Sequence, residues 1–170
     1  MNIKNHTNVS GKNKRGFTLI EILVVIGIIA VLAAVVLVAI NPTRQFKLAR
    51  DSQRVSNVDS ILNAIDQNMA EHGGTFMCGS NPTQIPTGPV VMASEDLNIP
   101  NGGLDGFDIG QCVVPAYISA LPFDPLGGPA LYVSPQHYDT GYTIAQDADG
   151  RITVSANSEV NLGVPISVTR

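Results

Sequence analysis

The longest hydrophobic segment of the chain lies near its N-terminus. Residues 22–40 carry no charge, and Gly27 is the only one of these 19 residues outside the set of Ile, Leu, Val and Ala. As a helix this segment would be about 29 Å long, close to the roughly 30 Å hydrocarbon core of a bilayer. A helix that is apolar on every side belongs in lipid or inside a large protein. A chain of 170 residues is too small to enclose it, so the pattern predicts a membrane helix.

A cleaved secretory signal is the alternative for this segment. Such signals have a shorter apolar core, of about 7–15 residues, followed by a small-residue cleavage site, and the ends of this run offer only weak sites. Glu21 stands at the start of the run, where an ionised carboxylate near lipid costs a few kcal/mol. A general export signal gains nothing from that charge, so Glu21 indicates a specific partner.

The apolar segment is followed by the pattern of an amphipathic helix over residues 42–72. Apolar side chains recur at three- and four-residue steps between Val55 and Met69, which predicts one buried stripe on a helix. Two glycines after His72 predict its end. Pro42 predicts a kink because it lacks an N–H and clashes with the carbonyl four residues before it. A segment that unwinds during assembly and a bend at the membrane exit explain this kink equally well.

Residues 73–170 are rich in Gly and Pro and predict a β-rich head. Alternating β-formers on both sides of Asp149-Gly150 predict a hairpin, whereas residues 79–110 have little pattern and predict a long surface loop with a short helix near 94–97. The fold class is therefore α+β, with a long N-terminal helix whose apolar half protrudes and whose second half packs against a small antiparallel sheet. The predicted strands cover residues 131–133, 142–146, 151–156 and 166–169.

Charge is distributed unevenly along the chain. Residues 1–16 carry four basic residues and no acid, whereas residues 73–170 carry nine acids and only two arginines. The acidic head repels phosphate, which argues against nucleic acid as a general partner. A hydrophobic content of 44% excludes a disordered chain.

Four basic residues share one side of the second helix, within about 120° of arc. Pairing with acids of a neighbouring head is the interpretation we favour for this basic stripe. Anionic lipid headgroups before assembly and a solvated face remain open, and DNA binding is a weaker option. The residues of the basic stripe are Arg44, Lys47, Arg50 and Arg54.

The N-terminal motif carries a family resemblance. Lys14-Arg15-Gly16-Phe17-Thr18-Leu19-Ile20-Glu21, followed by an unbroken apolar helix, resembles the start of type IV prepilins and type II secretion pseudopilins. The resemblance implies a leader peptide over residues 1–16, a polymerisation helix over 17–41 and a pilin-like head. It implies cleavage between Gly16 and Phe17 by a prepilin peptidase, and methylation of the new amino group of Phe17.

The same resemblance implies a role in assembly for Glu21. Cleavage creates an α-amino cation at the edge of an apolar environment, and Glu21 is an anion at similar depth. Two neighbouring subunits can neutralise each other's charges, whereas either charge alone stays unpaired in a low dielectric. A snorkelling carboxylate at the interface is the alternative.

We therefore expect a structural subunit of a type IV pilus-like filament, a homo-oligomer that is not an enzyme. The resemblance implies an assembly platform and an ATPase as further partners. It implies an inner-membrane precursor with its N-terminus in the cytoplasm, and an extracellular or envelope filament after assembly. The alternatives are a pseudopilin of a type II secretion or competence system, and a membrane-anchored binding domain that never polymerises. The segment 121–128 also resembles the proline-aspartate-proline loop of pilin heads.

Two cysteines and several acidic residues are candidates for a disulfide, a redox site or a metal site. In an exported domain Cys78 and Cys112 are expected to form a disulfide, with two buried thiols as the alternative. Their spacing excludes a C-x-x-C redox or zinc motif. Asp147-x-Asp149-Gly150 fails the EF-hand register because Arg151 stands at the fifth position. The sequence predicts no catalytic site, no metal and no cofactor.

Overall fold

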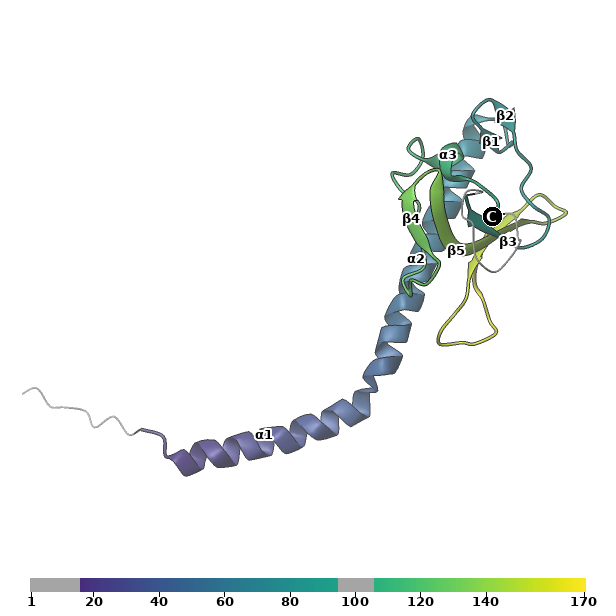
Figure 1. Cartoon of the computed structure of the whole chain (residues 1–170). Coiled ribbons are helices and arrows are strands. Elements are labelled where there is room, and N and C mark those ends of the chain that lie inside the picture. The colour runs from purple at the N-terminus through teal and green to yellow at the C-terminus, as the bar shows by residue number, and fades with distance from the viewer. Residues whose placement is uncertain (1–15, 95–105) are drawn as a thin grey trace, which may run out of the picture. The chain divides into compact units, whose positions relative to one another are not determined.

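The structure is a computed structural model that describes residues 16–94 and 106–170. Contacts divide the chain into two units, Met1–Pro42 and Thr43–Arg170, and each is described here by itself (Figure 1). The expected leader before Gly16 lies outside the described residues, as does most of the short helix expected near 94–97.

The first unit consists of the apolar helix α1, Leu19–Ile40. Thr18 is its N-cap, and Asn41, with φ 41°, ends it in the left-handed region. Every side chain of α1 is exposed. In the described part of the chain α1 is the one helix long and apolar enough to cross a membrane. The next helix begins at Pro42, and proline is favoured at a first helical position because the N–H it lacks would have no intrahelical partner there.

The second unit begins with helix α2, Pro42–Glu71. Gly73 and Gly74, with φ of 65° and 92°, end it, and the N–H of Gly74 donates to the Met69 carbonyl at 2.8 Å. The predicted stripe is confirmed except at its start, because Val55 is 48% exposed. The buried apolar residues of α2 are Val58, Ile61, Leu62, Ala64 and Ile65.

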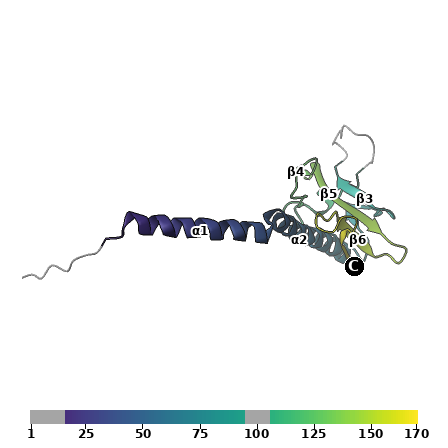
Figure 2. The ribbon, with the colours of Figure 1, turned by 90° about the horizontal axis from the view of Figure 1, so that it is seen from below.

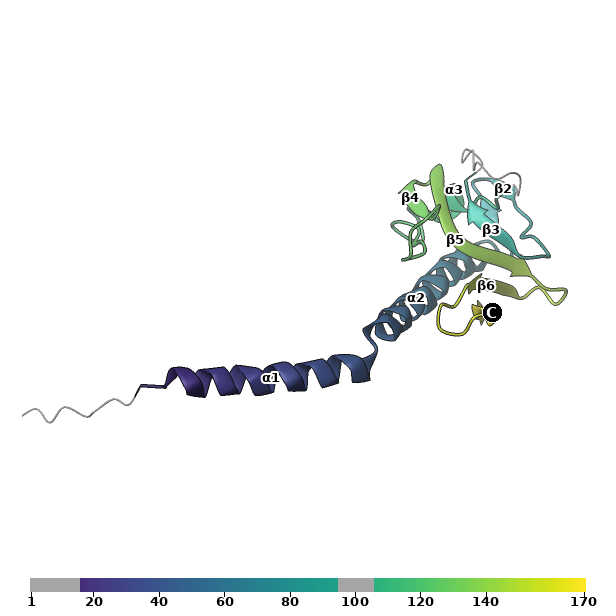
Figure 3. The ribbon, with the colours of Figure 1, turned by 60° about the horizontal axis from the view of Figure 1, so that its bottom comes forward.

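A five-stranded antiparallel sheet forms the body of the head (Figure 3). Its central strand is β5, His137–Gln146. Strand β3, Val90–Ala93, pairs with one edge of β5, and β4, Leu131–Ser134, pairs with the first half of β5. Strand β6, Ile152–Ala156, pairs with the second half of β5, and β7, Ile166–Thr169, lies beyond β6. The antiparallel sheet of the expected α+β fold is therefore present.

The predicted hairpin is the β5–β6 pair. Gln146 lies opposite Ile152, and the loop between them closes through the Asp147 N–H, which donates to the Arg151 carbonyl at 2.9 Å. Gly150, with φ 83°, takes the left-handed conformation that the turn requires. The expected strands at residues 131–133 and 166–169 are confirmed as β4 and β7.

The core lies between α2 and the sheet, which form two layers (Figure 2). Alternate residues of β6 point inward, so Ile152, Val154 and Ala156 are buried while the residues between them are half-buried. Tyr142 of β5 is fully buried, and its hydroxyl accepts a hydrogen bond from the Asn57 side chain of α2 at 2.8 Å. The buried residues of α2, from Val58 to Ile65, are thus covered within their own unit.

Four short elements lie within or next to residues 79–110, the region expected to be a loop; only β2 and β3 fall wholly inside it. They include β3, whose Met92 is fully buried, and helix α3, Gly110–Val113. The two-residue strands β1, Met77–Cys78, and β2, Asn81–Pro82, pair with each other. Expectation and structure differ because such short elements are formed by contacts with the rest of the head rather than by local periodicity.

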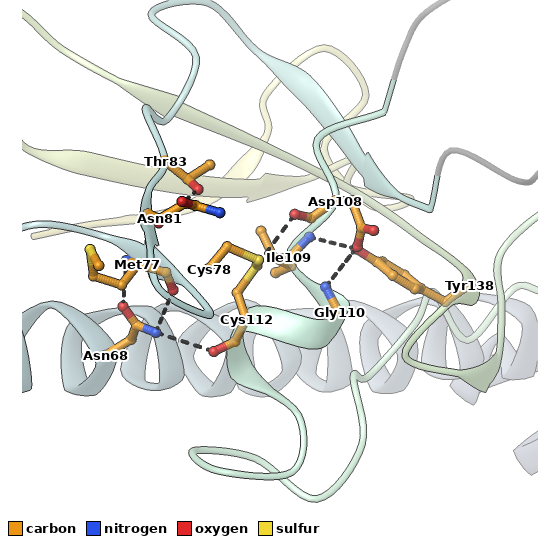
Figure 4. Close-up of a disulfide and its surroundings, with 10 residues drawn as sticks. All are labelled: Asn68, Met77, Cys78, Asn81, Thr83, Asp108, Ile109, Gly110, Cys112 and Tyr138. Atoms are coloured by element: carbon orange, nitrogen blue, oxygen red, sulfur yellow. Dashed lines mark hydrogen bonds between the residues drawn. A yellow bond between two sulfur atoms is a disulfide. The ribbon is translucent and has the colours of Figure 1, made fainter.

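The expected disulfide joins Cys78 of β1 to Cys112 of α3 (Figure 4). Asn68 of α2 supports both ends of this connection. Its side-chain amide donates to the carbonyls of Met77 and Cys112 at 2.9 and 3.1 Å, and its Oδ1 accepts the Met77 N–H at 2.8 Å. The disulfide and Asn68 together hold β1 and α3 at the C-terminal end of α2.

Tyr138 fixes the start of α3 from the other side (Figure 4). Its hydroxyl accepts the N–H groups of Ile109 and Gly110 and donates to Asp108 at 2.8 Å. Burial, together with the Asp108 carboxylate, raises the pKa of Tyr138, so this hydroxyl remains a donor. A side chain at Gly110 would lie 2.0 Å from the Pro135 carbonyl oxygen, so only glycine fits there.

We predict that the Cys78→Ser/Cys112→Ser variant loses stability. The disulfide closes a loop with a sequence separation of 34, and the loop-entropy estimate for such a closure is about 3–4 kcal/mol. Thermal unfolding of the full chain in detergent measures the difference. A reductant should lower the midpoint of the wild type and leave that of the double variant unchanged. Equal midpoints for the oxidised wild type and the variant would contradict the prediction.

Candidate functional site

The N-terminal end of α1 forms a capping box. The Thr18 hydroxyl accepts the backbone N–H of Glu21 at 3.3 Å. In return, the backbone N–H and the hydroxyl of Thr18 both donate to Oε2 of Glu21, each at 3.0 Å. This reciprocal arrangement satisfies N–H groups that a helix start leaves without partners. The carboxylate that the sequence marks as needing a partner is therefore bonded within its own chain, and its side chain is still exposed.

The predicted cleavage junction lies just before this cap. Gly16 and Phe17 are exposed and outside helical structure, and Phe17 is 83% exposed. Thr18 itself is extended, with φ −81° and ψ 151°. A protease can bind extended backbone directly, whereas a helical bond must first unwind. The helix start thus leaves the Gly16–Phe17 bond accessible.

The surface of α1 after Glu21 is apolar along the whole length of the helix. Its large aliphatic side chains are at least half exposed, from Val24 at 50% to Val38 at 84%. Apolar area in contact with water costs about 25 cal/mol per Å², so an exposed helix of this kind needs cover. Lipid or other helices of the same kind can provide it.

The basic stripe divides into two parts in the structure. Arg54 is buried, with 2% of its surface exposed. Its Nε and Nη2 donate to the two carboxylate oxygens of Asp124 at 2.7 and 2.9 Å, and its Nη1 donates to Asp51 and Glu159, each at 2.7 Å. An intersubunit role was expected for Arg54, and this expectation is corrected, because its guanidinium is enclosed by three carboxylates of its own chain.

Arg50 also has its partner within the chain. Its Nε and Nη2 bind the two oxygens of Glu159 at 2.7 and 2.6 Å, and its side chain is one-third exposed. The expected intersubunit pairing of Arg44 and Lys47 stays a prediction. Asp124 and Glu159 could not be assigned to this cluster from the sequence, because they lie 70 and 105 positions from Arg54.

Asp51 ties the loop after β6 to α2. Its carboxylate accepts the Ser158 hydroxyl at 2.7 Å and the backbone N–H groups of Glu159 and Val160 at 3.0 and 3.1 Å. Burial alone would raise the pKa of Asp51, but these donors and Arg54 outweigh it and hold the pKa well below its usual range. Asp51 therefore stays ionised in the folded head at neutral pH.

The electrostatics of Glu159 and Arg54 follow from the same contacts. The two hydrogen bonds from Arg50, and then the one from Arg54, lower the pKa of Glu159 to about 2 against the opposing effect of burial. The Asp124 carboxylate raises the pKa of Arg54. Among the described residues, no buried side-chain nitrogen or oxygen lacks a hydrogen-bond partner.

The described residues contain no group of three or more His, Cys, Asp or Glu side chains placed to hold a metal ion. The carboxylate of Asp147, in the segment that fails the EF-hand register, accepts the N–H groups of Asp149 and Arg151 and a hydrogen bond from the Arg151 side chain. Its oxygens are used to close the β5–β6 loop.

Comparison with known proteins identifies the N-terminal segment. The family model of the prokaryotic N-terminal methylation motif matches residues 11–37. The chain carries the prepilin-type leader of type IV pilins and pseudopilins. The match includes the Gly16–Phe17 junction, Glu21 and most of α1. No curated protein matches the chain, and no solved structure matches it.

We predict that the head loses stability as pH falls from about 5 to 2. The pKa of Glu159 is lower in the folded chain, at about 2, than in the unfolded chain. The stability it contributes is therefore complete above the unfolded pKa and is lost as pH falls through the folded one, an effect of about 1–3 kcal/mol. Asp51, whose pKa is also lowered, acts in the same direction. Denaturant titrations across this range measure the slope.

Glu159→Gln removes the titrating group and should make the free energy of unfolding depend less steeply on pH. Asp149→Asn is the matched control, because this carboxylate lies on a hairpin loop with its side chain 79% exposed. The stability of the Asp149→Asn variant should depend on pH as that of the wild type does. A Glu159→Gln variant with the full wild-type slope would show that the cluster does not carry the acid sensitivity.

Proposed function

We propose that this chain is a structural subunit of a type IV pilus-like filament that assembles through α1. The observation that supports this most strongly is a prepilin-type leader followed by a helix whose side chains are all exposed and apolar except the carboxylate of Glu21. A prepilin peptidase, an assembly platform and an ATPase are the partners that this function requires. The unassembled subunit would be held in the inner membrane by α1, with its N-terminus in the cytoplasm.

Processing is the first step of this proposal. Hydrolysis of the Gly16–Phe17 peptide bond releases the leader with a new carboxylate on Gly16 and leaves a new α-amine on Phe17. Methylation then adds a methyl group to that amine, which keeps its positive charge. The leader contains four of the ten basic residues of the chain, so processing leaves a strongly acidic subunit.

Assembly replaces the lipid around α1 with the α1 helices of other subunits. Moving the helix from lipid into a bundle of like helices keeps its apolar side chains out of water. The Phe17 amine and the Glu21 carboxylate fix the register between neighbouring helices. Burying either charge at low dielectric without an opposite charge beside it costs free energy. Glu21 of one subunit and the amine of its neighbour satisfy each other only when the helices are correctly staggered. Wrong staggers leave both charges unpaired and are disfavoured.

The capping box is compatible with this pairing. Both bonds from Thr18 go to Oε2 of Glu21, and a carboxylate has about four lone-pair sites on two oxygens. Glu21 can therefore keep its helix cap while it accepts an amine from a neighbouring subunit. Thr18 would orient the carboxylate, and the neighbour would neutralise it.

We predict that the mature chain begins at Phe17. In cells with a prepilin peptidase, the mass of the purified product should equal residues 17–170 with one added methyl group. Gly16→Glu should leave the precursor uncleaved, because the side chain and its charge enter the position next to the scissile bond. A product of wild-type mass from that variant, or a different N-terminus in the wild type, would contradict the processing step.

We also predict that Glu21→Gln is processed normally and forms at least tenfold fewer filaments. The substitution keeps the shape of the side chain and removes the charge that pairs with the amine, and losing one partner of a buried pair costs about 3–5 kcal/mol. Sheared filaments counted by electron microscopy and immunoblotting provide the measurement.

Thr18→Val is the matched control, because it removes the capping hydroxyl and keeps the Glu21 charge. It should assemble close to wild type. An equal loss in both variants would assign the defect to the helix cap rather than to pairing between subunits. The same micrographs separate long surface fibres from the short filaments of a pseudopilin.

A further inference from the structure

The loop between β6 and β7, residues 157–165, has an apolar tip that the head does not cover. Leu162 is 85% exposed and Val164 is 63% exposed. The tip reads Asn161-Leu162-Gly163-Val164-Pro165 and contains no charge. Large aliphatic side chains at such exposure are costly in water, and they lie together on one short turn.

The base of this loop is held rigidly on α2. Asp51 accepts three hydrogen bonds from residues 158–160, and the Ser158 hydroxyl in turn accepts the N–H groups of Val160 and Asn161 at 3.2 and 2.8 Å. Glu159 binds Arg50 and Arg54 through 2.6 and 2.7 Å contacts. The tip is therefore presented from a fixed base.

The base binds α2 near the beginning of the helix. Arg50 is the ninth residue of α2, and Phe46 lies one helical turn before it on the same face. Phe46 is 64% exposed. Figures 1 and 3 show the β6–β7 loop hanging from the sheet toward the end of the head at which α2 begins. The loop tip and Phe46 therefore lie at the same end of the head.

The covalent chain limits how far Phe46 can lie from the end of α1. Phe46 follows Ile40 by six residues, so at any angle between α1 and α2 its backbone stays within about 20 Å of the end of α1, and within about 9 Å if helical geometry continues. The headgroup layer on each side of a bilayer is about 5–8 Å thick. Lys47 lies in the same stretch and supplies a cation that anionic headgroups attract.

We propose that Leu162, Val164 and Phe46 form a membrane-docking surface, by which the head of the unassembled subunit rests on the anionic lipid interface around α1. The acids nearest to this surface do not oppose docking, because Glu159 and Asp51 are paired with Arg50 and Arg54. The lipid interface is favoured over a second copy of the chain because this surface adjoins the membrane helix in sequence. The proposal requires that α1 spans the bilayer and does not depend on filament formation.

The chain contains no Trp, so a single introduced Trp is the only tryptophan that contributes to the fluorescence. The test reconstitutes the full chain, at high lipid-to-protein ratio, in vesicles of phosphatidylcholine and phosphatidylglycerol with bromine near the headgroup end of the acyl chains. Fluorescence of Leu162→Trp should fall by about half relative to unbrominated vesicles, as expected for a side chain at the headgroup–acyl boundary. Adding Lys47→Glu, or omitting phosphatidylglycerol, should weaken this quenching.

Two variants make the result decisive. Val133→Trp replaces a side chain of β4 with 69% exposure and should not be quenched. Val31→Trp lies within α1 and should be quenched by bromine deep in the acyl chains, which shows that the helix is inserted. A Leu162→Trp signal as insensitive to bromine as that of Val133→Trp, with Val31→Trp quenched, overturns the proposal. A Leu162→Trp emission shift that depends on protein density and not on bromine also overturns it, and assigns the surface to a second copy.

Discussion

The apolar surface of α1 cannot be left in water, and the rest of the molecule is organised around that constraint. Every side chain of the helix is exposed in the isolated chain, and the described part of its unit offers nothing to cover them. In the proposed function, lipid satisfies the constraint before assembly, and a bundle of like helices satisfies it afterwards. Glu21 would make the second solution specific, because an unpaired carboxylate is tolerated far better at a membrane surface than in the interior of a bundle.

The head is built without any contribution from α1. Its core uses the stripe of α2, and the buried cluster around Arg54 joins α2 to two distant loops through Asp124 and Glu159. Burying one guanidinium is expensive, and the cost is offset because three carboxylates satisfy its donors. At the other end of α2 the disulfide and Asn68 hold β1 and α3. The head is thus fastened to its helix at both ends.

Features that depend on local pattern could be predicted from the sequence. The membrane helix follows from an uninterrupted apolar run, and the β5–β6 hairpin follows from alternating β-formers on both sides of Asp149-Gly150. The disulfide follows from two cysteines in an exported domain. The capping box is also local, since Thr18 and Glu21 are three residues apart.

Features that depend on distant contacts could not be predicted in this way. The sequence favours pairing of the basic stripe with a neighbouring head, yet Arg54 is buried because Asp124 and Glu159 of its own chain reach it from far along the sequence. Strand β3 is a short apolar run that becomes a strand only because β5 lies beside it. The periodic pattern of α2 predicts that Val55 is buried. In the structure Arg54 is buried instead, and its guanidinium binds these carboxylates.

The most direct test of the account is a cryo-electron microscopy structure of the assembled filament at side-chain resolution. The account predicts α1 helices packed together in the interior, with the methylated amine of Phe17 in one subunit within ion-pair distance, about 4 Å, of the Glu21 carboxylate of its neighbour. Filaments in which α1 lies on the outside, or in which every Phe17 amine is paired only within its own subunit, would contradict it.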